Sequence, residues 1–169
     1  MRIYDNTPPA PAPPAPPTAK PTPKSKATPA LKPTPTPQLA TNVLDRLSDR
    51  DPGIRYSGAW QVARFPAYEG GAVRYATGAG SRATLTVNAH AITWIGPVGP
   101  TRGQARVYVH GKLAATVDLY AGEFAARKSL FAKSWAKDGK HTIAIKVVGT
   151  RGRPFIAIDE LTATEERSR

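Results

Sequence analysis

Residues 104–120 read QARVYVHGKLAATVDLY, and this stretch decides the fold. Apolar and polar side chains alternate on both sides of His110, which is the pattern of two β-strands joined by a tight turn. Directly opposed residues of a hairpin share a face. A two-residue loop would set the two apolar sets on opposite faces, whereas a three-residue loop ending at Gly111 pairs Val107 with Leu113. We therefore predict a bulged hairpin with Gly111 in the left-handed position. The face opposite the apolar set is then shared by Arg106, Tyr108, Thr116, Asp118 and Tyr120.

The same alternation continues through residues 54–164, and Gly- and Pro-rich turns separate the segments. Short strands at such spacing are typical of an antiparallel β-sandwich or barrel, and no helical pattern interrupts them. We therefore predict an all-β, antiparallel domain. The expected strands are Ile54–Arg64, Ala72–Ala76, Arg82–Asn88, Ala91–Ile95, Gln104–Val109, Leu113–Tyr120, Arg127–Phe131, His141–Val148 and Phe155–Thr164.

The first 38 residues hold 13 of the 18 prolines of the chain. Proline removes backbone donors, and the Thr, Ala and Lys between the prolines supply little apolar surface to bury. We predict a disordered, polyproline-II-like linker over 1–38, with a ligand for a Pro-binding groove as the alternative. The N-terminal residues lack the apolar stretch of a signal peptide. The chain is then either cytosolic or a piece of a longer protein. Because Thr/Pro-rich stalks are common outside the cell, we favour the second and expect an extracellular or cell-surface protein whose export signal lies upstream of this chain.

Two further boundaries follow. Residues 39–53 lead into the domain, either as a short helical turn that ends before Pro52 or as an extended segment. We expect the β-sandwich over 54–164 and a disordered tail over 165–169.

The composition excludes several classes of protein. The chain has 169 residues, a net charge of +12 and no cysteine, so it has no disulfide framework, Cys-ligated zinc site or thiol nucleophile. No apolar run is long enough for a transmembrane helix. The basic excess is spread along the chain without a nucleic-acid motif, so we expect no specific nucleic-acid partner. A solvated surface is one interpretation of this charge and a salt-sensitive affinity for anionic polymers is the other.

No catalytic constellation is evident. His90, His110 and His141 lie in or beside turns, and none belongs to a metal-binding pair on a helix. No nucleophile elbow or phosphate-binding loop is present. We expect a protein that is not an enzyme and that carries no cofactor.

Several stretches resemble a known family of domains. These are Ile92–Pro97, Arg102–Lys112, Thr116–Tyr120, Gly139–Ile143 and Ile158–Leu161. They are similar to the galactose-binding-like β-sandwich (jelly-roll) domains of secreted bacterial proteins, which are regarded as carbohydrate-binding-module-like. The resemblance covers about residues 54–163 and implies a jelly roll. The family pattern usually has Asp where His110 stands. An Asp near the end of the last strand can hold a structural calcium in such domains, so Asp159 is a candidate ligand, with hydrogen bonding to backbone donors as the alternative.

The leading hypothesis is a monomeric, non-catalytic module that binds carbohydrate or a cell-wall polymer. Aromatic rings stack on sugars while polar neighbours bond the hydroxyls. The candidate binding residues are Trp94, Arg106, Tyr108, Asp118, Tyr120 and Trp135. Each has a structural alternative: Trp94 alternates with Ile92 and would then fill the core. A structural or adhesive domain without a sugar ligand and a weak polyanion binder remain open.

Overall fold

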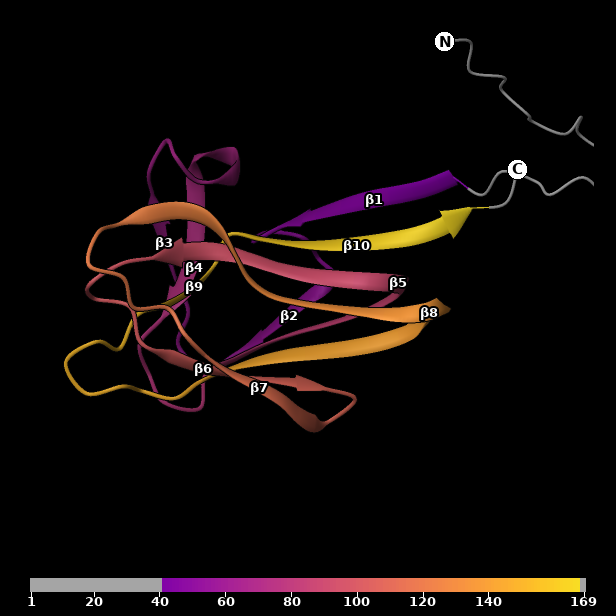
Figure 1. Cartoon of the computed structure of the whole chain (residues 1–169). Coiled ribbons are helices and arrows are strands. Elements are labelled where there is room, and N and C mark those ends of the chain that lie inside the picture. The colour runs from indigo at the N-terminus through magenta and orange to yellow at the C-terminus, as the bar shows by residue number, and fades with distance from the viewer. Residues whose placement is uncertain (1–40, 168–169) are drawn as a thin grey trace, which may run out of the picture. The chain divides into compact units, whose positions relative to one another are not determined.

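A computed structural model describes residues 41–167 (Figure 1). The predicted linker, residues 1–38, lies outside the described residues. Within 41–167 the only helical element is one short 3-10 turn, and all strand pairs within the sheets are antiparallel, so the predicted fold class is confirmed. The elements are β1 (Thr41–Ser48), β2 (Ile54–Ser57), β3 (Gln61–Arg64), η1 (Glu69–Gly71), β4 (Ala72–Ala76), β5 (Arg82–Val98), β6 (Gln104–Val109), β7 (Lys112–Asp118), β8 (Ala125–Val147), β9 (Ile156–Ile158) and β10 (Glu160–Arg167).

The strands form two sheets. The larger has the order β1-β10-β5-β8-β6-β7, with β2 also paired to β5, and the smaller has the order β3-β4-β9. Most neighbours within the sheets are distant in the chain, as in double-sheet jelly rolls. These residues contain no helix with the length and hydropathy that a bilayer crossing needs.

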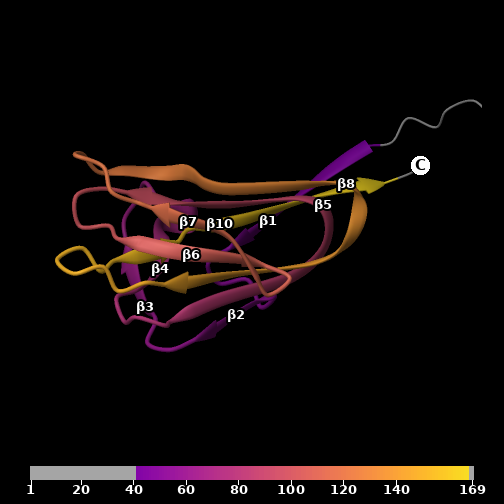
Figure 2. The same cartoon turned by 60° about the horizontal axis from the view of Figure 1, so that its bottom comes forward.

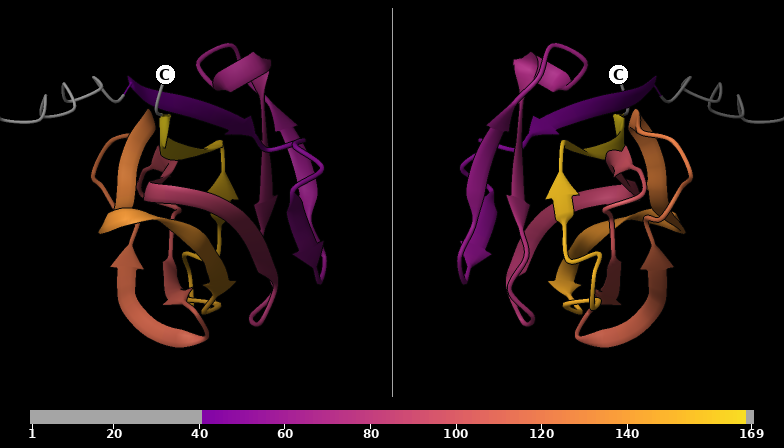
Figure 3. Two further views of the ribbon diagram at one scale, coloured as in Figure 1. Left: turned by 90° about the vertical axis from the view of Figure 1, so that its right-hand side faces the viewer. Right: turned by 90° about the vertical axis from the view of Figure 1, so that its left-hand side faces the viewer.

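The larger sheet makes both layers of the sandwich because β5 and β8 bend. Their pairing shifts between Ala89 and Ala91, where residues 135–138 of β8 have no partner in β5. Figures 1 and 2 show β8 turning back on itself there, and Figure 3 shows the curvature of β5 and β8. Residues 82–89 and 139–146 pair beside β2, β6 and β7, while 91–98 and 125–134 pair beside β10.

One apolar core lies between the layers. Its largest fully buried side chains include Leu85, Val107 and Ile145 from the layer with β6, and Ile92, Trp94 and Leu161 from the layer with β10. At about 25 cal/mol per Å² of apolar surface removed from water, this burial is the main stabilising term of the fold.

The β6–β7 hairpin differs from the prediction. Its loop has only two residues, His110 and Gly111, whose φ values of 51° and 77° define a type I′ turn. The extra residue lies in β7 instead, so Val107 pairs with Ala115 and not with Leu113. The predicted three-residue loop is therefore wrong. One extra residue does bring Ala115 and Val117 onto the inner face with Val107 and Ala105, but Leu113 lies opposite Tyr108 on the outer face and is 56% exposed.

Two predicted strands are broken where the chain passes between sheets. The segment 54–64 divides at Gly58, which has a φ of +87° and where a Cβ would lie 2.6 Å from Ser81 Oγ, so glycine is needed there. The segment 155–164 divides at Asp159 into β9 of the smaller sheet and β10 of the larger.

The edge of the large sheet extends beyond the predicted domain. Of the two alternatives for 39–53, the extended one is confirmed for β1, which pairs with β10 from Thr41 opposite Arg167 to Ser48 opposite Glu160. Because β10 ends at Arg167, residues 165–167 of the predicted tail are strand.

Candidate ligand-binding surface

The outer face of the layer formed by β2, β6, β7 and the paired segments 82–89 and 139–146 carries most of the predicted site residues. Ala105 and Val107 of β6 are fully buried, so the side chains between and beyond them point outward. Arg106 is exposed and Tyr108 half-buried. Asp118 of β7 lies opposite Gln104 on the same face. The predicted sharing of one face by Arg106, Tyr108 and Asp118 is confirmed, whereas their role in binding stays a prediction.

Tyr120 is held in place by a polar cluster just beyond β7. The Asp118 carboxylate accepts hydrogen bonds from the Tyr120 backbone N–H at 2.9 Å and from both terminal nitrogens of Arg153 at 3.1 and 3.3 Å. These bonds lower the pKa of Asp118, the Arg153 hydrogen bond most of all. The guanidinium of Arg153 lies 4.7 Å from the centroid of the Tyr120 ring. Tyr120 is 56% exposed, so a positioned aromatic ring faces solvent here.

Arg153 was not singled out by sequence reasoning. It lies 35 positions from Asp118 in a Gly-rich turn, and no pattern of spacing links the two residues. The presence of two arginines in that turn, Arg151 and Arg153, was the only feature of the sequence that could have indicated a role for it.

Trp94 does not belong to this surface. Its side chain has no solvent exposure, and its Nε1 donates a hydrogen bond to the Ala157 carbonyl at 3.3 Å. The structural alternative therefore holds for Trp94, and its prediction as a ligand contact is wrong. The alternation with Ile92 was the correct signal, since both residues point into the core.

Trp135 lies apart from Tyr108 and Tyr120, beside the tip of the β6–β7 hairpin. Its ring stacks on His141, with centroids 3.5 Å apart and planes 8° apart. His141 Nδ1 lies 2.9 Å from His110 Nε2, so the two imidazoles share a hydrogen bond. Burial lowers the pKa of His141, and nearby His110 lowers it further. One face of Trp135 is thus covered by His141, which leaves it less ring surface than Tyr120 offers.

The buried carboxylates have local partners. Asp159 has no solvent exposure, and its Oδ1 accepts a hydrogen bond from the Glu69 backbone N–H at 2.8 Å. Burial raises the pKa of Asp159. Glu160 is equally buried and lies between Arg46 and Arg127, at 3.5 and 3.6 Å. No group of three or more metal-ligating side chains gathers within residues 41–167, so a metal role for Asp159 stays a prediction.

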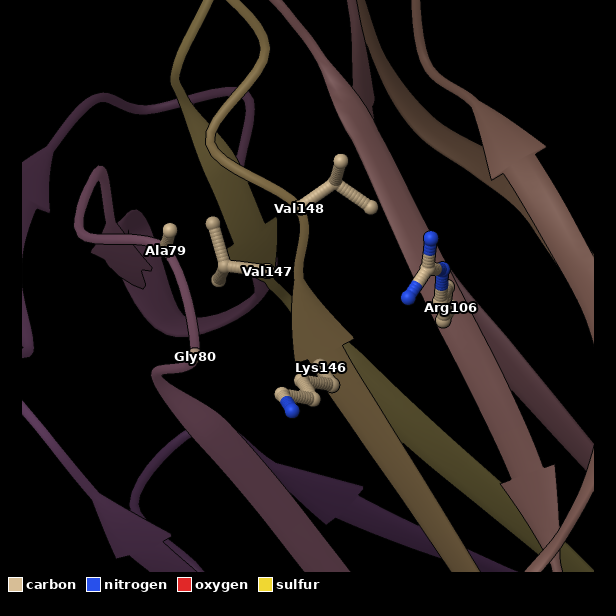
Figure 4. A pocket seen from close by; sticks show the side chains of 6 residues that line it. All are labelled: Ala79, Gly80, Arg106, Lys146, Val147 and Val148. Atoms are coloured by element: carbon tan, nitrogen blue, oxygen red, sulfur yellow. The ribbon is translucent and has the colours of Figure 1, made fainter.

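A shallow hollow of about 320 Å³ opens on the outer face (Figure 4). Arg106 of β6 and Lys146 of β8 line it. Its remaining lining is small or apolar, from Ala79, Gly80, Val147 and Val148. The arrangement suits a polar or charged group held against an otherwise apolar wall.

Comparison of the sequence with known proteins finds relatives among carbohydrate-active enzymes, although no family model matches the chain. Over 102 residues it is 36% identical to an A type blood N-acetyl-alpha-D-galactosamine deacetylase of Flavonifractor plautii. Over 129 residues it is 32% identical to an A type blood alpha-D-galactosamine galactosaminidase of the same organism. These matches span 60% and 76% of this chain but only 13% and 11% of the two enzymes.

The fold recurs in solved structures at low sequence identity. A family two carbohydrate esterase from Cellvibrio japonicus matches 76% of this chain with a TM-score of 0.57 and 14% identity, over 36% of its own length. A Paenibacillus xanthan lyase matches 85% of this chain with a TM-score of 0.53 and 13% identity, over 14% of its own length. The chain therefore has a β-sandwich fold that also occurs within carbohydrate-active proteins. The narrower resemblance to galactose-binding-like domains stays a prediction.

Proposed function

We propose that this chain is a non-catalytic carbohydrate-binding module of a larger, exported bacterial protein. The observation that carries the proposal is the pair of curated matches. One segment, similar to a small part of a deacetylase and of a galactosaminidase, accompanies two different reactions. A segment common to both is better suited to holding a sugar than to either reaction. The Pro/Thr/Lys-rich composition of residues 1–38 supports a tethered, exported domain.

The chemistry of four of the described carboxylates also favours binding over catalysis. General acids and bases need an accessible group with a pKa near the working pH. Asp49, Asp159 and Glu160 are at most 1% exposed, which keeps them from a polysaccharide. Asp118 is accessible, but Arg153 lowers its pKa and occupies both of its oxygens.

Tyr120 and Tyr108 are the proposed sugar contacts. An exposed ring stacks on the apolar face of a pyranose, and the guanidinium of Arg153 fixes the Tyr120 ring from one side. Arg106 and Gln104 supply donors for hydroxyl groups on the same face.

The test is binding of the purified chain to a glycan array and to insoluble polysaccharides. We expect retention on a subset of glycans that Tyr108→Ala with Tyr120→Ala abolishes. Phe65→Ala is the matched control, because Phe65 is 46% exposed but packs against Tyr68 and Phe124 instead. Wild-type retention on no glycan would leave the structural or adhesive role, and turnover of a sugar substrate would refute the non-catalytic proposal.

A further inference from the structure

A row of three cations crosses the outer face of the layer that contains β6. Arg82 of β5 is directly opposite Lys146 of β8, and Lys146 is directly opposite Arg106 of β6. The residues adjacent to all three in their own strands, such as Ala83, Ile145 and Val107, are buried, so the three cations point to the same outer side. Neighbouring strands lie about 4.8 Å apart, so the row extends over roughly 10 Å.

The charge of this row is uncompensated. Like charges directly opposite each other destabilise a sheet. Within the part of the chain that the structure describes, none of the three cations forms an ion pair with an acidic residue. The row ends on Ser57 of β2 and Thr116 of β7, which carry no charge.

Three arginines outside the row are paired with acids. Arg127 contacts Glu69 at 2.8 Å, and Arg46 contacts Glu160 at 3.5 Å. The acid nearest the row in register, Asp118, is bound by Arg153. The acid closest to the row is therefore already paired and does not compensate the charge of the three cations.

The surroundings of the row suit an anionic group. Arg106 and Lys146 border the hollow of Figure 4, whose other walls are Val147, Val148 and Ala79. Apolar walls concentrate the field of nearby charges, and a guanidinium binds carboxylate or sulfate through two parallel hydrogen bonds. Arg82 also lies 5.8 Å from the centroid of the Tyr108 ring, so an aromatic surface adjoins the cations.

We propose that Arg82, Lys146 and Arg106 bind the acidic groups of an anionic polysaccharide, whose carboxylates or sulfates would neutralise the row. This inference rests on the proposed carbohydrate-binding function and narrows its ligand to charged glycans. The aromatic ring beside the row favours a polysaccharide over a polyphosphate, because a pyranose presents an apolar face to it.

The experiment compares matched polymers by calorimetry at low and moderate salt. Polygalacturonate is compared with its methyl ester, which lacks the carboxylate charge. Chondroitin sulfate is compared with chondroitin, which lacks the sulfates but keeps its carboxylates, so the two pairs separate carboxylate from sulfate. The row variant is Arg82→Gln, Lys146→Gln and Arg106→Gln. The control variant is Lys128→Gln, Lys133→Gln and Lys137→Gln, which removes three exposed lysines of β8 outside this face.

We expect at least one of the more highly charged polymers to bind ten-fold or more tightly than its less charged partner. The row variant should lose this preference and the control should keep it within three-fold. The row variant should also unfold at the same or a higher temperature, because like-charge repulsion is removed, so its loss of binding would not reflect misfolding.

Equal losses in both variants would overturn the inference, since bulk charge would then explain binding. Single-stranded DNA bound as tightly as the charged glycan, with the same dependence on the row, would overturn it in favour of a general polyanion surface. Neutral glycans bound undiminished by the row variant would refute only this inference. No glycan bound by the wild type, neutral or charged, would refute the proposed function itself.

Discussion

Gly103 lies where three segments meet, and its replacement by alanine tests how the Tyr120 cluster is held. Its backbone N–H donates a hydrogen bond to Phe155 O at 3.2 Å, and its carbonyl accepts one from Leu119 N at 2.9 Å. An alanine Cβ would overlap the Arg153 carbonyl oxygen and lie 2.9 Å from Thr150 Oγ1. Thr150 cannot easily move away, because its Oγ1 accepts a hydrogen bond from Gln104 N at 2.8 Å.

The expected cost follows from this crowding. Overpacking by one methyl group typically costs about 1–3 kcal/mol, and overlap with backbone places Gly103→Ala at the upper end. For a domain of this size, about 3 kcal/mol corresponds to a fall in Tm of roughly 10 °C. Displacement of Arg153 should also weaken its hydrogen bonds to Asp118, so the lowered pKa of that carboxyl should rise toward its usual range.

Calorimetric or urea unfolding measures the first effect, and NMR titration of the Asp118 carboxyl measures the second. Gly122→Ala is the matched control, because nothing lies within 4 Å of its added Cβ and its φ is not left-handed. It should change stability by about 0.5 kcal/mol or less. The reasoning is refuted if Gly103→Ala unfolds at the same midpoint as Gly122→Ala.

Three further predictions concern the core and the titratable groups. Trp94→Ala should cost about 3–5 kcal/mol in guanidinium unfolding, because the ring is fully buried, and a loss below about 1 kcal/mol would contradict that burial. The lowered pKa of His141 means that its stabilising contribution is complete above pH 6.5 and is lost as the pH falls through the lower, folded-state pKa. His141→Phe should therefore flatten the fall of the urea midpoint between pH 7 and pH 5, and an unchanged slope would count against this assignment. Because the pKa of Asp118 is lowered, this carboxylate contributes to stability in full above pH 3.8, and the contribution is lost as the pH falls through its lower, folded-state pKa. A double-mutant cycle of Asp118→Asn with Arg153→Gln should show a coupling energy of at most about 1 kcal/mol at pH 7, since the pair is partly exposed, and a clearly larger coupling would contradict this.

The local alternation of apolar and polar side chains was sufficient to predict many of the strands. The strands at Ala72–Ala76 and Gln104–Val109 were predicted to the residue. The shared face of Arg106 and Asp118 followed from the same period of two. The face on which each side chain of a hairpin lies can be worked out without knowing which other strands the hairpin pairs with.

Long-range features were not predictable in this way. Residues 82–98 and 125–147 appeared as two strands each, because no local signal distinguishes a bend between layers from a loop between strands. The position of the hairpin bulge depends on packing against β8, which fixes Val107 opposite Ile145. The pairing of Arg153 with Asp118 depends on a turn that folds back over the end of β7, and composition does not report such contacts.

The antiparallel pairing of β1 with β10 brings Thr41 and Arg167 together at one edge of the sheet. Opposed pulling on these two residues would load the hydrogen bonds of that ladder one after another, so the edge would unzip at low force instead of shearing as a unit. The two ends of the described part of the chain therefore lie at the same corner of the domain.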